Sequence, residues 1–150
     1  TDITEGRAVI VDQDHSEMTY AFAQRLALRF TAVSIVTARE RIGHDVSLIN
    51  RQNILQRLFD QDIELICHVE PDSLDGLEEG QLIMKNVYND RISELSDVVT
   101  VVHASSRVPN QHLLTPLRAN GLEVIPIGDC RAPRSLMAAT HEGYQVANTL

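Results

Sequence analysis

The chain has 150 residues, of which 43% are hydrophobic and 23% charged, and 13 Lys+Arg against 21 Asp+Glu give a net charge of -8. This composition is typical of a globular protein with a substantial core, and the negative charge argues against nucleic acid or an anionic membrane as a partner. No apolar run approaches the roughly 18 residues of a membrane span. The two cysteines, Cys67 and Cys130, are too few for a zinc or iron–sulfur site with four cysteine ligands.

The start of the chain and its cysteine usage indicate its setting. No signal-peptide pattern opens the sequence, and the two cysteines do not form a C-x-x-C pair. We therefore expect a cytoplasmic protein. Because the chain begins at Thr1 and stops inside a predicted helix, we also expect it to be part of a longer protein.

The first third of the chain follows a strand–helix–strand pattern. Arg7–Asp12 and Ala32–Thr37 are short apolar runs rich in β-branched residues, which predict buried strands. Between them, a helix with an apolar face toward the core is predicted by residues that recur every four positions: Met18, Phe22, Leu26 and Phe30. Asp14, followed by Glu17, marks the helix start. This order predicts a βαβ unit with two parallel strands.

The remaining elements are predicted by the same reasoning. A second helix over Val46–Asp60 has its apolar side formed by Leu48, Leu55, Leu58 and Phe59. The other expected elements, in chain order, are a strand over Ile63–Val69, a hairpin of Gln81–Tyr88 and Arg91–Leu95 turning at Asn89-Asp90, a strand over Asp97–Ala104, a short helix over Leu113–Ala119, a strand over Glu123–Ile127 and a helix over Arg134–Thr149. Asp97–Ala104 is the most hydrophobic run and predicts a central parallel strand.

These elements predict an α/β fold, a three-layer sandwich. We expect a mostly parallel Rossmann-like sheet with helices on both faces and a β-hairpin insertion. Residues 1–150 would form a single domain, with a core in 1–104 and a returning segment in 105–150. Because sequential strands usually lie side by side, we expect Glu123–Ile127 to join the sheet beside Asp97–Ala104. Pairing of that segment with a second copy, in a homodimer, is the alternative.

The first strand–helix turn, Asp12–Ser16, is the natural place for a dinucleotide fingerprint, but it contains no glycine. A tight turn and close approach of a pyrophosphate require glycines, and two carboxylates would repel the phosphates. We interpret Asp14 as a helix cap and Asp12 as solvated. An acidic pair after a first strand is also typical of phosphate-accepting receiver domains, but Asp72 is poorly placed for their further carboxylate and Lys85 falls in the hairpin.

Two segments near the end of the chain carry more specific patterns. Asp97–Asn110 reads DVVTVVHASSRVPN, and Val124–Gly143 runs from a predicted strand through Gly128-Asp129 and Ala132-Pro133-Arg134 into a helix. Together they resemble the C-terminal region of the trimethylamine dehydrogenase and 2,4-dienoyl-CoA reductase branch of the old yellow enzyme-like oxidoreductases. The corresponding family patterns are roughly D-x-V-V-x-A-T-G-R-x-P-N and G-D-x-x-A-P-R-x-x-x-x-A-x-x-x-G.

The resemblance implies that the chain belongs to a larger oxidoreductase. In that family an N-terminal β/α barrel holds FMN and a 4Fe-4S cluster and does the chemistry, and two dinucleotide-type domains follow. In the reductases these domains bind FAD and NADPH, whereas in the amine dehydrogenases one holds ADP and the other has lost its ligand. The resemblance therefore implies that Gly128, Asp129 and Arg134 contact FAD or ADP in the parent protein, and that the parent barrel is the partner of this chain.

Three departures from the family pattern bear on nucleotide binding. The first turn lacks its glycines, Ser106 replaces the glycine of A-T-G-R, and Thr37–Arg41 stands in place of a clean acidic ribose acceptor. We expect an NAD(P)H site that is vestigial, and a fragment that binds no cofactor and has no catalytic residue. A ligand-free domain that packs on the parent barrel or a partner subunit is one alternative. A working NADPH-binding module, with Arg39 and Arg41 near the 2′-phosphate, is the other.

The remaining reactive side chains indicate neither a metal site nor a nucleophile. No pair of the six histidines has H-x-x-x-H spacing, and the G-x-S-x-G motif of a nucleophile elbow is absent. We therefore expect no metal ligands and no catalytic residues in this chain.

Overall fold

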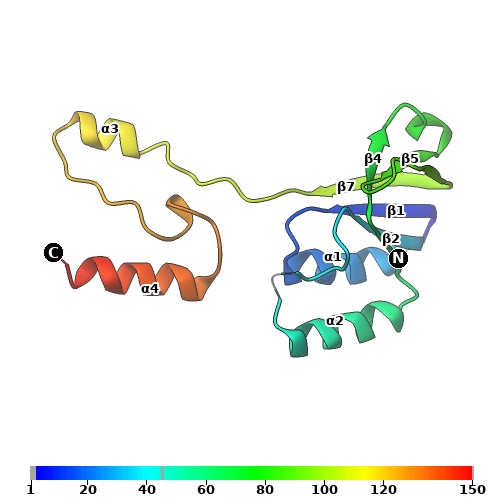
Figure 1. The fold of residues 1–150 in the computed structure, drawn as a ribbon, viewed down its shortest axis with the longest axis horizontal. Coiled ribbons are helices and arrows are strands. Elements are labelled where there is room, and N and C mark those ends of the chain that lie inside the picture. Colours follow the sequence, from blue (N-terminus) through cyan, green and yellow to red (C-terminus); the bar gives the residue numbers. More distant parts are fainter. Residues whose placement is uncertain (1–2, 45, 150) are drawn as a thin grey trace. The chain divides into compact units, whose positions relative to one another are not determined.

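The computed structural model describes residues 3–44 and 46–149. The chain folds as two compact units, Thr1–Ser106 and Arg107–Leu150 (Figure 1). The boundary lies close to Ala104, where the sequence predicts the end of the Rossmann-like core.

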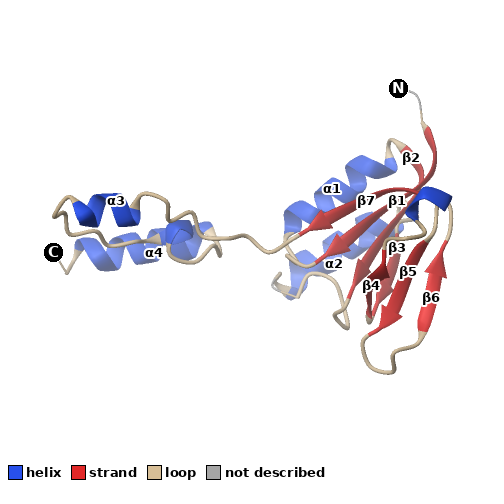
Figure 2. Ribbon diagram, turned by 90° about the horizontal axis from the view of Figure 1, so that it is seen from above, coloured by secondary structure: helices blue, strands red, loops and turns tan. Residues whose placement is uncertain are grey.

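The first unit contains two sheets and two α-helices (Figure 2). Its elements are β1 (Thr4–Asp12), α1 (Glu17–Ala27), β2 (Phe30–Thr37), α2 (Leu48–Phe59), β3 (Glu64–Cys67), β4 (Val69–Ser73), β5 (Leu82–Asn86), β6 (Ile92–Leu95) and β7 (Val98–Ala104), with a 3-10 turn over Leu77–Glu79. One sheet has the order β3-β2-β1-β7 and is parallel, and the other has the order β4-β5-β6 and is antiparallel. The βαβ unit, the α/β class and the hairpin are confirmed.

The core of this unit has three layers. Side chains of β1 and β2 alternate between the two faces of the parallel sheet, so each face needs a layer that covers it. Ile10 and Ile35 pack with α1 and α2 on one face, and Val9 and Val36 pack with the β4–β6 sheet on the other. The second face is thus covered by a sheet, where the sequence predicts a helix layer. The predicted strand Ile63–Val69 is broken at His68, whose φ is 65°, so the chain turns there into β4 and widens the hairpin to three strands.

Two predictions about the parallel sheet and its helices are wrong. β7 pairs with β1 in the order β3-β2-β1-β7, so it is an edge strand of the described sheet and not a central one. In α1, Met18 is 77% exposed and Phe22 is 45% exposed, while Thr19, Tyr20 and Ala23 face the core. A step of four residues advances about 400° around a helix, so a stripe with that spacing drifts off the core side.

The end of the predicted first helix and the apolar face of the second also differ from the prediction. Phe30 lies in β2, not in the helix. In α2 the buried residues are Ile54 and Leu58, whereas Leu48 is 62% and Phe59 is 63% exposed. Leu58 is therefore the one predicted member of this apolar side that is fully buried.

The second unit consists of α3 (Leu114–Ala119), a 3-10 turn over Gly128–Cys130 and α4 (Leu136–Ala147). Both predicted helices are confirmed. The predicted strand Glu123–Ile127 is wrong: the described residues of this unit contain no strand, and 123–127 pair with none of the described strands. Its β-branched residues favour an extended backbone, which Ile127 adopts with a φ of -134° and a ψ of 160°, but a strand is completed only by a neighbour that accepts and donates ladder hydrogen bonds. No described helix of the chain is long and apolar enough to cross a bilayer.

Candidate functional site

In open α/β sheets, ligands bind at the carboxyl ends of the parallel strands. Here Asp12 ends β1 and Thr37 ends β2. A pocket of about 190 Å³ lies at this edge, lined by Val11, Asp12, Gln13, His15, Thr37, Ala38, Arg39, Val69 and Glu70. Sites for cofactors and comparable ligands usually measure about 300–1,000 Å³, so this pocket is too small for a dinucleotide as it stands.

Asp12 joins several groups at this carboxyl-terminal edge of the sheet by hydrogen bonds. The prediction that it is solvated is wrong. Its side chain is buried, with 2% of the residue exposed. One carboxylate oxygen, Oδ1, accepts the His15 backbone N–H at 2.9 Å, and Oδ2 accepts the Tyr20 hydroxyl at 2.7 Å. The Tyr20 oxygen in turn accepts the Gly43 backbone N–H at 2.5 Å. This chain of hydrogen bonds joins β1, α1 and the loop before α2.

The turn after β1 uses its own acceptors for its backbone amides. Asp14 Oδ1 accepts the Ser16 N–H at 3.0 Å and the Thr19 hydroxyl at 2.6 Å, and Asp14 Oδ2 accepts the Ser16 hydroxyl at 2.8 Å. The Gln13 N–H donates to Ala104 O at 2.9 Å. The amides of residues 13, 15 and 16, which in a glycine-rich turn would face a pyrophosphate, are therefore all bonded within the chain. Asp14 holds the start of the helix, as predicted, although Ser16 occupies the N-cap position.

Burial and the Asp12 charge raise the pKa of two neighbouring groups. Burial raises the pKa of the Tyr20 hydroxyl far above its usual value, and the Asp12 carboxylate adds to the shift through its charge and its hydrogen bond. Burial also raises the pKa of the Cys67 thiol, with a further contribution from Asp12. The edge therefore holds one buried carboxylate, a neutral phenol and a neutral thiol at physiological pH, which is unfavourable for a phosphate.

The two arginines that follow β2 are exposed. Arg39 lines the pocket, its N–H donates to the Thr37 hydroxyl at 3.3 Å, and its carbonyl accepts the His68 N–H at 3.1 Å. Arg41 pairs with its neighbour Glu40, with 3.3 Å between Nη1 and Oε1. Of the two, Arg39 is thus the one that borders the pocket.

The second unit contains the three residues that the family resemblance singles out. Gly128 is buried with a φ of +58°, and its N–H donates to Glu142 Oε2 at 2.8 Å. Asp129 keeps 64% of its side chain exposed and lies 4.0 Å from Arg107 Nη1. Arg134 is bonded to the Glu142 carboxylate, on the oxygen that Arg131 also approaches at 3.4 Å. The Asp129 carboxylate is thus accessible, whereas the Arg134 guanidinium already has an internal anion.

Sequence reasoning missed two residues that hold these sites together, Tyr20 near the end of β1 and Glu142 in the second unit. Tyr20 falls in the helical pattern without any motif, and its role becomes visible only when Gly43, far along the chain, is brought beside it. Glu142 lies within the Gly-Asp pattern but was assigned no role, although it is 7% exposed and carries the turn amide and two arginines. An acidic residue directly before the glycine of the predicted last helix was the available signal.

Among the residues that the structure describes, no group of three or more His, Cys, Asp or Glu side chains is arranged to hold a metal ion. His68 faces the ring of Tyr88 at a centroid distance of 5.5 Å. His15 is buried, with Nδ1 3.4 Å from Asp12 Oδ2. Within the described residues the Nδ1 atoms of both histidines are buried and make no hydrogen bond, so these contacts place the two side chains in packing roles.

No protein-family profile and no curated protein matches the sequence, whereas many solved structures share the fold. Histamine dehydrogenase from Rhizobium sp. 4-9 matches 97% of this chain with a TM-score of 0.83 and 23% identity. The 6-hydroxypseudooxynicotine amine oxidase from Pseudomonas geniculata N1 matches 94% with a TM-score of 0.82 and 20% identity. Thioredoxin reductase from Lactococcus lactis matches 98% with a TM-score of 0.68 and 17% identity, over 52% of its own length.

At these identities the similarity establishes the fold. The chain spans 23% of the histamine dehydrogenase and 21% of the amine oxidase. Both are trimethylamine dehydrogenase-like flavoenzymes, the group that the motifs of this sequence indicate, so the structural comparison confirms the resemblance at the level of the fold. The structural neighbours are flavoprotein oxidoreductases.

Proposed function

We propose that this chain is a Rossmann-like domain of a larger FMN- and iron–sulfur-dependent oxidoreductase of the amine dehydrogenase or enoate reductase type, and that its NAD(P)H site is vestigial. The observation that carries the proposal is that the turn at Asp12–Ser16 is closed: its backbone amides at residues 13, 15 and 16 are already hydrogen-bonded within the chain. A phosphate arriving there would have to displace Asp12 and Asp14 from the amides of residues 15 and 16, and it would meet their charges. The chain keeps the fold of a nucleotide-binding domain and lacks the free donors.

Calorimetric titration of the chain with NADH and NADPH tests the vestigial site. We expect no binding tighter than the millimolar range for either nucleotide. Micromolar binding would refute the proposal. In that case Arg39→Gln is the informative variant, since losing the guanidinium beside the pocket should weaken NADPH and leave NADH unchanged. Arg91→Gln, an exposed arginine that does not line this pocket, is the matched control.

The flavin chemistry of the parent would reside outside this chain. Two cysteines, Cys67 and Cys130, cannot supply the four thiolates of a 4Fe-4S cluster, and we place the cluster and FMN in the barrel. For FAD or ADP the residues fit in part. The exposed Asp129 carboxylate would accept ribose or ribityl hydroxyls, and Gly128 sets the turn that presents it. Arg134 would contribute little, because Glu142 holds its guanidinium.

The described part of the second unit has no apolar core of its own, which supports its assignment to the FAD or ADP domain of the parent. Gly128 and Glu142 are the buried residues in its described part, and Leu136, Met137 and Tyr144 are 82%, 79% and 70% exposed. We propose that this surface completes the FAD or ADP domain of the parent. In the longer protein, Asp129→Asn should lower the bound adenine nucleotide per chain, while Asp90→Asn, an exposed carboxylate of the first unit, should not. An unchanged nucleotide content in the Asp129 variant contradicts the assignment.

The exposed apolar surface also favours a second candidate function, that of a ligand-free domain that packs on the parent barrel or a partner subunit. The two functions differ in the longer protein. If denaturation releases nucleotide in a fixed ratio to the amount of chain, the first function, that of a nucleotide-binding domain, is supported. Absence of nucleotide, together with loss of the parent's assembly when Leu136 and Met137 are changed to Ser, supports the second.

A further inference from the structure

A groove of about 410 Å³ lies beside the carboxyl-terminal half of α1, at the edge of the sheet opposite the Asp12 pocket. It is lined by Thr4, Phe22, Arg25, Leu26, Arg29 and Phe30. Thr4 and Phe30 begin β1 and β2, whereas Asp12 ends β1. At about 3.3 Å per residue, the nine residues of β1 separate the two places by about 26 Å. The groove is therefore separate from the proposed nucleotide site.

The groove combines an apolar wall with two guanidinium groups. Phe22, Arg25, Leu26 and Arg29 are spaced i, i+3, i+4 and i+7, so the wall follows a single side of the helix and its C-terminal end. Phe22 remains 45% exposed although its ring is large and apolar. The backbone of the floor is fixed, because the Thr4 N–H donates to Arg29 O at 2.7 Å and Thr4 is paired with Phe30.

Among the described residues, the two arginines of the groove have no anionic partner. Within residues 3–44 and 46–149, neither Arg25 nor Arg29 forms an ion pair or a side-chain hydrogen bond, in contrast to Arg7, which is bonded to Glu64. The chain as a whole carries a net charge of -8, and in this groove two unpaired cations lie together with a partly exposed aromatic ring. Small-ligand sites are lined mainly by apolar and aromatic side chains, with a few polar or charged groups that orient the ligand.

We infer that this groove is a binding site for an amphipathic anion, a ligand with an acyl or aryl body that ends in a carboxylate or a phosphate. The apolar body lies against Phe22, Leu26 and Phe30, and the anionic end is held by Arg25 and Arg29 at the mouth. The volume lies within the range of about 300–1,000 Å³ usual for small-ligand sites.

Titration of ¹⁵N-labelled chain with sodium decanoate, followed by backbone amide shifts, tests the site. Decanol, which has the same chain length without the charge, is the second probe. We expect decanoate to shift the amides of residues 22–30 and to bind more tightly than decanol. The double variant Arg25→Gln/Arg29→Gln should weaken decanoate about fivefold, as two exposed charged contacts would, and leave decanol unchanged. Phe22→Ala should weaken both probes about fivefold or more through lost apolar contact.

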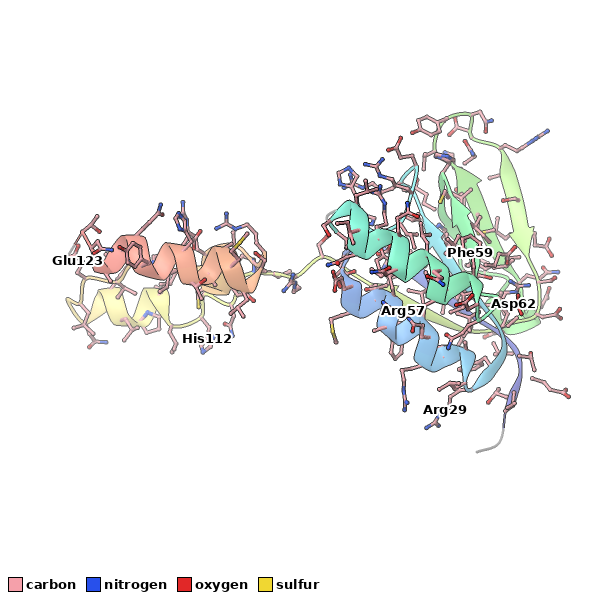
Figure 3. The ribbon with its side chains drawn as sticks, turned by 90° about the horizontal axis from the view of Figure 1, so that it is seen from below. Arg29, Arg57, Phe59, Asp62, His112 and Glu123 are labelled. Carbon is pink, nitrogen blue, oxygen red and sulfur yellow. The ribbon has the colours of Figure 1, made fainter. Side chains whose placement is uncertain are left out.

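The chain offers matched controls on α2 (Figure 3). Arg57 lies in the last turn of α2, as Arg25 does in α1, and Phe59 is an exposed phenylalanine outside the groove. Arg57→Gln and Phe59→Ala should therefore change neither affinity. Four outcomes overturn the inference: no shifts at residues 22–30, shifts confined to the second unit, equal binding of decanoate and decanol, or equal weakening by the α2 variants. A second titration with decyl phosphate decides which anionic head is preferred.

Discussion

Replacing Tyr20 by Phe tests whether the buried hydrogen-bond chain at the end of β1 stabilises the first unit. The change removes one hydroxyl and preserves the packing of a side chain that is 0% exposed. It leaves Asp12 Oδ2 without its donor at 2.7 Å and the buried Gly43 N–H without its acceptor at 2.5 Å. A buried polar group without a partner costs about 1–3 kcal/mol. Two such groups should lower the free energy of unfolding by about 3 kcal/mol.

Urea unfolding followed by circular dichroism measures this loss. Tyr88→Phe is the matched control, because the Tyr88 side chain is 76% exposed and its ring contact with His68 does not need the hydroxyl. We expect the control to remain within about 0.5 kcal/mol of the wild type, as is usual for surface changes. If Tyr20→Phe loses no more than the control, then the hydrogen bonds that run from Gly43 through Tyr20 to Asp12 do not stabilise the first unit.

The same residue predicts how stability changes at alkaline pH. The pKa of Tyr20 is raised above its usual value of about 10 by burial and by the Asp12 charge. Its contribution is thus fully present below pH 10 and is lost as the pH rises, because the unfolded chain releases a proton that the folded chain keeps. The free energy of unfolding should fall by about 1.4 kcal/mol per pH unit above pH 10 from this group. Tyr20→Phe should lack that part of the slope, and parallel slopes would contradict the assignment.

Three further experiments test other parts of the chain. Iodoacetamide at neutral pH should alkylate the exposed Cys130 before Cys67, whose thiol is partly buried and has a raised pKa, and mass spectrometry of the peptides would reveal equal labelling if this is incorrect. Gly6→Ala should lower the free energy of thermal unfolding by about 2 kcal/mol or more, because Gly6 has a φ of +112° and a Cβ there would lie 2.6 Å from Val99 Cγ1; an unchanged midpoint would argue against it. Glu142→Ala should speed hydrogen exchange at the turn before α4, whereas Glu142→Gln, which keeps an acceptor oxygen, should have a smaller effect, and equal exchange in all three proteins would exclude a role for this carboxylate.

The sequence predicts the order of elements well where the pattern depends on local chemistry. The βαβ unit follows from two β-branched runs separated by a helix, and it is correct to within a few residues. The apolar faces of α1 and α2 are predicted less well. Met18 and Phe22 are as apolar as any core residue, but the core side is occupied by Tyr20 and Ala23, since a small side chain lets the helix approach the sheet and a tyrosine carries a polar end that Asp12 satisfies.

Tertiary pairing explains the remaining differences. Nothing in the run Ile63–Val69 indicates that His68 adopts a φ of 65° and starts a new strand in another sheet. Likewise, the composition of Glu123–Ile127 favours an extended chain, but a strand requires a partner, and the described chain supplies none. The Gly-Asp turn was predictable because Gly128 needs its φ of +58°, a conformation that favours glycine.

The first turn illustrates how a fold can persist where its usual ligand contacts are replaced. In a glycine-rich turn the backbone amides at the helix start are free, and a pyrophosphate supplies the acceptors that they need. Here Asp12 and Asp14 supply those acceptors from within the chain, at 2.9 and 3.0 Å from the amides of His15 and Ser16. The residues that satisfy the amides are also the residues that repel a phosphate, so stabilisation of the turn and loss of the anion site have a single cause. It follows that removing one carboxylate would leave an amide unsatisfied without restoring a nucleotide site, because the remaining carboxylate would still oppose the phosphate.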